Sequence, residues 1–436
     1  MGKGDRLLSG SSINKVSGLR VWDSRGRPTV EVRVRLEDGA QGRAIAPAGA
    51  STGSGEATDK RDGGAPFGGY DVRGALEAVS GEIATALIGA DAFDQAAVDR
   101  CLIELDGTQN KSRLGGNAMI ATSMAAAQAA AASAGLPLWR HLRGDNPAFL
   151  PLPEIQIFGG GAHAGRRVDI QDFMVIAVGA GDYAEALNWT AEVYRAAGDL
   201  MAEAGRLCGV ADEGGYWPEF ETNEDALAML VGAIEKAGFE PGADVAISLD
   251  IAASEFGRGG RYRLARDDSD LDSDGLIELL LGWIETYPIV SVEDPLGEDD
   301  PGGFARFTAA AGNHLQIVGD DLLVTNAARV GAAADRKSCN ALLVKPNQAG
   351  TLSETRAAFD AARDAGFGAI VSARSGETED VTMVHLAVGW GAPQMKVGSF
   401  ARSERMAKWN EGLRIADDLG GRGPLYPSSA FPWGLD

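Results

Sequence analysis

The second part of the chain repeats one pattern, a short apolar run that ends on polar or charged residues and is followed by a helical stretch. Six runs follow it in order: DVAISLD, YPIVSVED, LQIVGDD, ALLVK, GAIVSARSG and QMKVGS. The intervals are long enough for a helix, which indicates repeated β–α units. This pattern constrains the fold most strongly, because such units form either an open, doubly wound sheet or a closed barrel.

The ends of these runs favour the barrel. In an open sheet their polar side chains would be spread along a line, whereas in a (β/α)8 barrel the carboxyl ends of the strands converge on one pocket. An unpaired buried charge is also costly, so a strand that ends on Lys345 is best explained by a shared site. We therefore expect an α/β protein with a TIM barrel over residues 148–436. The residues at the six strand ends are Asp250, Glu293, Asp320, Lys345, Arg374 and Lys396.

Residues 1–147 have a different rhythm, typical of a small α+β domain. Val30, Val32 and Val34 alternate with charged residues, the period of a half-buried antiparallel strand, and EDGA contains an Asp-Gly turn signal. Helices are predicted over RGALEAVSGEIATALIG, AFDQAAVDRCLIELDG and NAMIATSMAAAQAAAASAG, the last one buried and ending at Gly135. The first fifteen residues contain no signal-peptide core and are interpreted as a flexible start.

Charge and cysteine usage exclude several classes of partner. The 436 residues include 40 Lys+Arg against 62 Asp+Glu, a net charge of −22, and such a surface is repelled by nucleic acid and anionic membranes. An anionic substrate therefore needs its own local cations. Three widely separated cysteines favour a reduced, cytoplasmic setting, and four histidines without HxH or HExxH spacing argue against a zinc site.

Asp250, Glu293 and Asp320 are predicted on neighbouring strands, where three carboxylates repel one another unless a cation neutralises them. All-oxygen ligands favour a hard ion, and Mg²⁺ fits best; for any single acid, an ordinary solvated side chain is the alternative. Lys345 and Lys396 would face this triad. Nearby positive charge lowers a lysine pKa toward a neutral amine that can act as a base, while a metal would stabilise the doubly charged carboxylate formed when an adjacent C–H loses its proton.

Other motifs carry weaker signals, each with a plain structural alternative. DEGG places Glu213 on a glycine-flanked loop that could protonate a leaving hydroxyl or could be a simple turn. The loop GASTG contains Ser51 and could present its hydroxyl to phosphate or metal, or act as a flexible linker. SARSG would place a phosphate clamp at a strand end. The other polar residues expected at the barrel mouth are His163, Gln171, Asp172, Arg374 and Ser375.

Taken together, these motifs resemble those of enolases, in order, from about residue 18 to about residue 418. The resemblance implies an N-terminal α+β capping domain followed by a modified barrel that opens ββαα, two Mg²⁺ ions per active site, and a homodimer or higher homo-oligomer. It also implies a carbon–oxygen lyase like those of EC 4.2.1.11. The matching stretches include DSRGRPTVEV, GASTG, DEGG, LDIAASEF, VEDP, VGDDLLVTN, LLVKPNQAGTLSE, SARSGETEDVT and ARSERMAKWNEGLRI.

Carried over residue by residue, the resemblance implies a role for each candidate. Lys345 would take the C2 proton of a 2-phosphoglycerate-like acid, Glu213 would help the C3 hydroxyl leave, and Lys396 would contact the substrate carboxylate. The catalytic candidates are Lys345, Glu213, Lys396 and Asp172. The residues that would hold the metals are Asp250, Glu293, Asp320 and, for the second ion, Ser51. The residues that would bind substrate or line the pocket are Arg374, Ser375, His163, Gln171 and Lys396.

Departures from the enolase pattern gather around the hydroxyl and phosphate. Ala373 replaces an active-site histidine, Asp172 shortens a glutamate, and Gly55 replaces a loop histidine. Tyr216 and Trp217 are also new and could line a larger group. These changes favour a carboxyphosphonoenolpyruvate synthase of phosphonate/phosphinothricin-type biosynthesis, which would combine the acid with a nucleotide-activated phosphonoformate. Ordinary dehydration of 2-phosphoglycerate to phosphoenolpyruvate is the alternative, and a non-catalytic enolase-fold binding protein is the third hypothesis.

Overall fold

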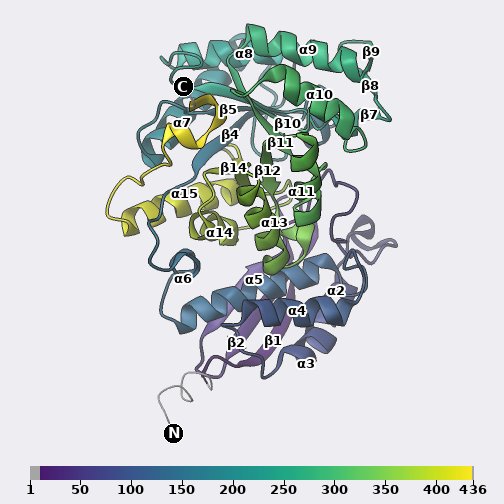
Figure 1. The fold of residues 1–436 in the computed structure, drawn as a ribbon, viewed down its shortest axis with the longest axis vertical. Helices are drawn as coiled ribbons and strands as arrows, with labels where there is room; N and C mark the ends of the chain where they lie inside the picture. Colours follow the sequence, from purple (N-terminus) through teal and green to yellow (C-terminus); the bar gives the residue numbers. More distant parts are fainter. Residues whose placement is uncertain (1–9, 435–436) are drawn as a thin grey trace.

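The computed structural model describes residues 10–434 and shows an N-terminal α+β part beside a helix-covered barrel (Figure 1). The N-terminal part contains an antiparallel sheet in the order β1-β2-β3. Its strands are Ile13–Trp22, Pro28–Leu36 and Gln41–Ile45. Strand β1 thus begins inside the segment that was expected to be a flexible start, which is a correction; residues 1–9 of that segment lie outside the described residues.

Burial of one face of the sheet explains only part of the alternation of apolar and charged residues in β2. Val30, Val32 and Val34 are fully buried, as the period of two predicts. Glu31 on the opposite face is also buried, with 2 % exposure. Its carboxylate accepts a hydrogen bond from Arg33 Nε at 2.7 Å and lies 3.7 Å from Arg43 on β3, so paired charge takes the place of solvent.

The alanine-rich helix α5 (Gly116–Ser133) packs on β2 and β3 at very close range. Gly42 permits this approach, because a Cβ there would lie 2.0 Å from the carbonyl oxygen of Ala125. Gly135, at φ +69°, follows the helix end as predicted.

The other N-terminal helices follow the predicted order with one difference. A π-helical turn at Val79–Ile83 divides the first predicted helix into two short ones. The helices are α2 (Arg73–Ala78), α3 (Ala84–Leu87), α4 (Gln95–Asp106) and α6 (Leu138–Arg143).

The second part is a closed eight-stranded barrel in the order β10-β11-β12-β13-β14-β4-β5-β6, as predicted. Strand β5 runs antiparallel to both neighbours, and the other adjacent pairs are parallel. Two strands precede the first two barrel helices, which is the ββαα opening that the resemblance implied. The strands are β4 (Leu152–Gly159), β5 (Asp172–Ile176), β6 (Ala246–Asp250), β10 (Ile289–Glu293), β11 (Gln316–Gly319), β12 (Ala341–Val344), β13 (Gly368–Ser372) and β14 (Gln394–Gly398).

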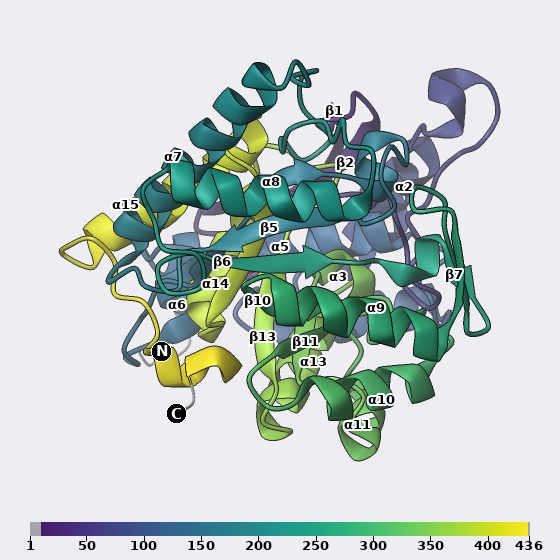
Figure 2. The same ribbon diagram turned by 90° about the horizontal axis from the view of Figure 1, so that it is seen from above.

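Helices surround the strands of the barrel (Figure 2). A small three-stranded sheet projects from its rim between β6 and α9, formed by β7 (Gly257–Arg258), β8 (Arg261–Leu264) and β9 (Ser269–Asp272). The helices are α7 (Tyr183–Glu203), α8 (Asn223–Lys236), α9 (Ser273–Thr286), α10 (Pro301–Ala311), α11 (Ala327–Arg336), α12 (Pro346–Ala349), α13 (Leu352–Asp364), α14 (Thr382–Trp390) and α15 (Ser403–Asp418). Within residues 10–434, none of the helices combines the length and apolar character needed to cross a bilayer.

Loops of the N-terminal part contact the carboxyl ends of the barrel strands. The hydroxyl of Ser24 donates to the carbonyl oxygen of Ser375 at 3.2 Å, and Ala48 forms an isolated β-bridge with Gly376. These contacts place the loop between β3 and α2 over the open end of the barrel, where the predicted site lies.

Candidate active site at the open end of the barrel

A small cavity at the carboxyl ends of the barrel strands brings the candidate residues together. Strands β6, β10 and β11 are neighbours and carry the three predicted metal ligands at their ends. Because β5 runs antiparallel, its first residue reaches the same end of the barrel. Glu293 and Asp320 lie outside the lining, and each contacts one of its lysines. The candidates that line the cavity are Ser51, His163, Gln171, Asp172, Glu213, Asp250, Lys345, Arg374, Ser375 and Lys396.

Lys396 is buried among carboxylates. Its Nζ donates to Asp250 Oδ2 at 2.9 Å and to Glu293 Oε2 at 2.8 Å, and lies 3.4 Å from Asp172 Oδ2. Burial alone lowers the pKa of Lys396, but Asp250 and Glu293 outweigh it and raise that pKa well above its ordinary value. Lys396 is therefore held as a cation, which suits contact with an anionic group better than proton abstraction.

Lys345 is ion-paired with Asp320 through its Nζ and Oδ2. Burial lowers the pKa of Lys345, but the adjacent Asp320 reverses this and leaves it above its ordinary value. The lowering of this pKa was predicted for a lysine beside a dication and stays a prediction; in the observed arrangement the ammonium itself neutralises Asp320. The amine can act as a base only when another cation engages that carboxylate.

The site contains more carboxyl groups than its two lysines can neutralise. Burial and then Asp250 raise the pKa of Glu293 well above its ordinary value, and burial and then Asp320 raise the pKa of Asp321 to about 8. Oε1 of Glu293 and Oε1 of Gln171 are buried without a hydrogen-bond partner among residues 10–434. These all-oxygen donors and their surplus charge fit a hard divalent cation.

Lysines pair with all three predicted metal ligands. Asp250 and Glu293 share Lys396, whereas Asp320 is paired with Lys345. In the part of the chain that the structure describes, the acidic or histidine groups with ligand atoms within 4.8 Å of one another are instead Asp294–Asp320–Asp321 and His163–Asp172–Glu213.

His163 connects Asp172 to the loop that carries Ser375. Its Nδ1 lies 2.9 Å from Asp172 Oδ1, its Nε2 lies 3.0 Å from Ser375 Oγ, and Glu213 Oε1 is 3.7 Å from Nε2. Burial by itself lowers the pKa of His163, but Asp172 and Glu213 raise it to about 9. The imidazole is therefore charged at neutral pH, at the point where the cavity meets the predicted phosphate clamp.

The His163–Asp172 pair predicts a pH-dependent stability. A histidine with pKa 6.5 unfolded and about 9 folded binds more protons in the folded state between these values. Its contribution is complete below the unfolded pKa and is lost as the pH rises through the folded one. Chemical denaturation across this window should show a falling free energy of unfolding in the wild type and a smaller fall in His163→Gln. The same slope in both proteins contradicts the pairing.

The loop that carries Ser51 is closed onto Arg374. The Arg374 guanidinium donates to Glu56 Oε2 at 3.1 Å and to the carbonyl oxygen of Ser51 at 3.0 Å. Glu56 Oε1 also accepts from Gln348 at 3.2 Å. Glu56 was not among the predicted site residues, although an acid within a Gly/Ser-rich loop is a visible signal. A substrate anion that uses Arg374 must compete with this carboxylate.

Gln156 and Arg405 were also missed, and both position residues of the site. The Gln156 amide donates to Asp172 Oδ1 from inside β4. Arg405 is fully buried and donates to the carbonyl oxygens of Arg374 at 2.7 Å and Ser375 at 2.6 Å. The signal for Gln156 was a polar residue within the apolar run PEIQIF, whereas an arginine in a polar helix gave none.

Tyr216 and Trp217 lie outside the lining of this cavity. Tyr216 stacks on Tyr194 with ring centroids 4.4 Å apart, and a Cβ at Gly198 of α7 would lie 2.3 Å from its hydroxyl. The expectation that Tyr216 lines a larger substrate group is therefore wrong, whereas the expectation for Trp217 stays a prediction. Tyr216 instead anchors the loop of Glu213 against α7.

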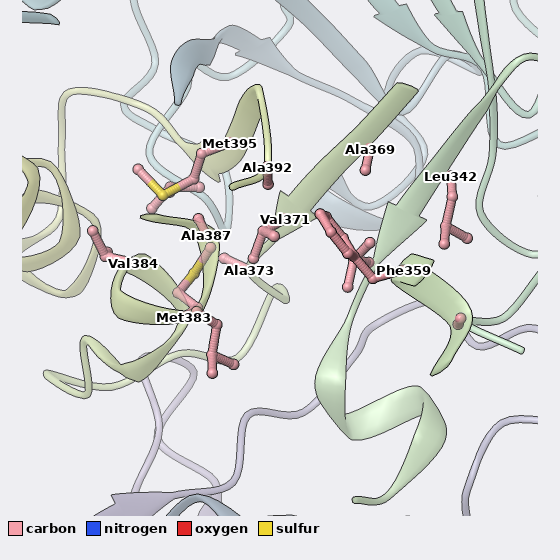
Figure 3. Packing of buried hydrophobic residues seen from close by; sticks show 14 of the residues in the cluster. Leu342, Phe359, Ala369, Val371, Ala373, Met383, Val384, Ala387, Ala392 and Met395 are labelled. Carbon is pink, nitrogen blue, oxygen red and sulfur yellow. The ribbon is translucent and has the colours of Figure 1, made fainter. Parts of the chain in front are cut away.

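Ala373 does line the cavity, and it also belongs to the apolar cluster behind it. Figure 3 shows Ala373 with Val371, Met383 and Ala387 in the packing between β13 and α14. At this position only the methyl group of Ala373 therefore lies between the cavity and the apolar core. The short side chain of Asp172 lines the same cavity.

The fold and the site define a capped β/α-barrel protein in which lysine, carboxylate and guanidinium groups share one cavity at the barrel mouth. The N-terminal domain of enolase, as a family model, matches residues 13–142, and the C-terminal TIM barrel domain of enolase matches residues 147–430. Together these matches cover nearly the whole chain. The protein therefore belongs to the enolase family and is an enolase-superfamily enzyme of the lyase type.

Proposed function

We propose that Lys345 removes the C2 proton of a 2-phosphoglycerate-like acid to form an enolpyruvate product. The observation that carries this is the joint burial of Lys345 and Lys396 in one cavity with acids on one side and Arg374 on the other. Lys396, fixed as a cation, would hold the substrate carboxylate, while Arg374 and Ser375 would bind the phosphate in exchange for Glu56.

Divalent metal is part of this proposal. Asp250, Glu293 and Asp320 would hold one Mg²⁺, and Ser51 would help to hold a second. When bound, the ions would supply positive charge that stabilises the carboxylate of the deprotonated substrate. Engagement of Asp320 in this way would free Lys345 from its ion pair, so that burial and the neighbouring positive charge lower its pKa.

The proposed specialised reaction is carboxyphosphonoenolpyruvate synthesis, with a nucleotide-activated phosphonoformate as the second substrate. It is supported by the side chains that Ala373 and Asp172 present to the cavity, which are smaller than the histidine and glutamate of the enolase pattern. The charged imidazole of His163 would remain beside Ser375 as a partner for an additional anionic group. The product would carry the carboxyphosphonate on its enol oxygen in place of the phosphate. The C3 hydroxyl would leave as water, a water molecule would release the original phosphoryl group as inorganic phosphate, and the phosphonoformate would lose its nucleoside monophosphate.

Ordinary enolase dehydration is the second candidate. It is favoured by Glu213, which lines the same cavity as Lys345 and would be the acid that helps the C3 hydroxyl leave. The two reactions share proton abstraction and differ in whether a second substrate is required.

Two incubations distinguish these candidates. The purified protein with Mg²⁺ and 2-phosphoglycerate should form little phosphoenolpyruvate, and addition of the nucleotide ester of phosphonoformate should start formation of the phosphonate product. Phosphorus NMR follows both products in one sample. Rapid phosphoenolpyruvate formation without the second substrate would reject the specialised reaction in favour of ordinary dehydration, and absence of both products would reject the two together.

A further inference from the structure

A cavity of about 1000 Å³ lies beside the catalytic one, between the β7–β9 sheet and helices α10 and α11. Both views place these elements together on one side of the barrel (Figures 1 and 2). The cavity is at the upper end of the size range of small-molecule sites and is much larger than a bare phosphate needs. Its apolar lining includes Phe256, Leu271, Pro301 and Leu322.

Arginines enter this cavity from two sides. Arg258 and Arg261 lie opposite each other on the β7–β8 hairpin, and Arg336 ends α11 on the other side. Among residues 10–434, these three guanidinium groups have no hydrogen bond or ion pair. In a chain of net charge −22, three unpaired guanidinium groups around one hollow indicate an anionic ligand.

The acids that line the same cavity are already engaged. Glu255 pairs with Arg166 at 2.8 Å and Asp270 with Arg263 at 2.7 Å. Glu298 accepts from the backbone N–H and the hydroxyl of Ser54, each at 2.9 Å, and Asp299 accepts from the backbone N–H of Gly259 at 2.9 Å. The lining carries five arginines against four acids, so its formal charge is weakly positive; they are Arg258, Arg261, Arg263, Arg329 and Arg336 against Glu255, Asp270, Glu298 and Asp299.

The cavity shares a wall with the catalytic loop. Ser54 lines it, and the guanidinium of Arg329 donates to the carbonyl oxygen of Ser54 at 2.6 Å. Gly55 makes this contact possible, because a Cβ at that position would lie 2.5 Å from Arg329 Nη2. The same loop carries Ser51 into the catalytic cavity, so one loop contributes to both cavities.

We infer that this cavity binds a nucleoside monophosphate group, with its phosphate on Arg258, Arg261 and Arg336 and its nucleoside against the apolar lining. Guanidinium groups match phosphate oxygens through paired N–H donors, and the volume accommodates a base and a sugar. The inference rests on the proposed function in one respect, because the bound nucleotide is taken to be the nucleotide part of the activated second substrate.

The test measures binding without turnover. The full-length protein is titrated by calorimetry with the four ribonucleoside 5′-monophosphates and, separately, with inorganic phosphate. At least one nucleotide should bind more tightly than inorganic phosphate, with an affinity that falls as salt rises. The triple variant Arg258→Ala/Arg261→Ala/Arg336→Ala should bind it at least about tenfold more weakly. Arg195→Ala, which removes an exposed arginine from α7, is the control and should bind as the wild type does.

The outcomes separate this site from the proposed reaction. Unchanged nucleotide affinity in the triple variant, no nucleotide binding, or equally tight binding of inorganic phosphate each overturns the inference. All three arginines are exposed and unpaired, so the variant should keep the circular dichroism spectrum and melting temperature of the wild type. Formation of the phosphonate product without nucleotide binding here rejects this site and keeps the proposed function. Arginine-dependent nucleotide binding without that product supports the site and rejects the proposed specialised reaction.

Discussion

Replacing Lys345 with methionine should lower the rate of enolpyruvate formation by about two to four orders of magnitude, the contribution expected of a general base. Methionine keeps the length and apolar stem of the side chain but has no proton acceptor of suitable basicity. The KM for the acid should change much less, since Lys396 and Arg374 hold the substrate. Initial rates of product formation at saturating Mg²⁺ give both parameters.

Lys236→Met is the control for this experiment. Lys236 is ion-paired with Glu203 on the outer surface of α8, so its loss should leave the rate unchanged. Because Lys345→Met also removes the partner of Asp320, its folding should be checked by circular dichroism with Mg²⁺ present. A folded Lys345→Met protein that keeps the wild-type rate would refute the assignment of the base.

The second large effect concerns stability. Arg405→Met should reduce the free energy of unfolding by about 3–5 kcal/mol, the range for breaking a buried charged network. The Arg405 side chain is fully buried, and its loss leaves the carbonyl oxygens of Arg374, Ser375 and Val397 without these donors. Urea denaturation measures the change, and any folded fraction should also bind phosphate-bearing ligands more weakly because the loop of Arg374 is no longer fixed.

A matched arginine lies just beyond the same helix. Arg422 makes an exposed ion pair with Asp182 at 3.1 Å, and Arg422→Met should cost no more than about 1 kcal/mol, as is usual for surface pairs. Equal destabilisation by the two substitutions would show that the hydrogen bonds of Arg405 to the strand-end loops do not stabilise the fold more than a surface ion pair does.

The barrel and the position of its site were predictable because they depend on local pattern. Apolar runs that end on charged residues give the strands, and barrel closure brings their ends together, so Asp250, Lys345 and Lys396 could be placed on one cavity from sequence. Residues that act through tertiary contacts could not. Arg405 is buried although its helix sequence is polar, and Tyr216, taken for a pocket residue, packs against α7 instead.

The protonation states of the site residues also could not be predicted from the sequence. The sequence predicted that Lys345 would face the three acids, but the direction of a pKa shift depends on which charge lies nearest and on what else that charge contacts. In the structure the nearest partner of Lys345 is the carboxylate, so its pKa rises. Without a bound cation, Lys345 and Asp320 form an ion pair that has no catalytic role. With a cation bound to Asp320, Lys345 can act as a base and Asp320 as a metal ligand.

The most direct test of this account follows the C2 hydrogen of the substrate rather than the final product. The protein is incubated with C2-deuterated 2-phosphoglycerate in ordinary water, with Mg²⁺ or with excess chelator, and loss of deuterium is followed by NMR. We predict washout with Mg²⁺ and none with chelator, whatever product is finally made. Retention of deuterium under both conditions, or equal washout in both, would contradict the claim that this site removes a C2 proton with the help of a divalent cation.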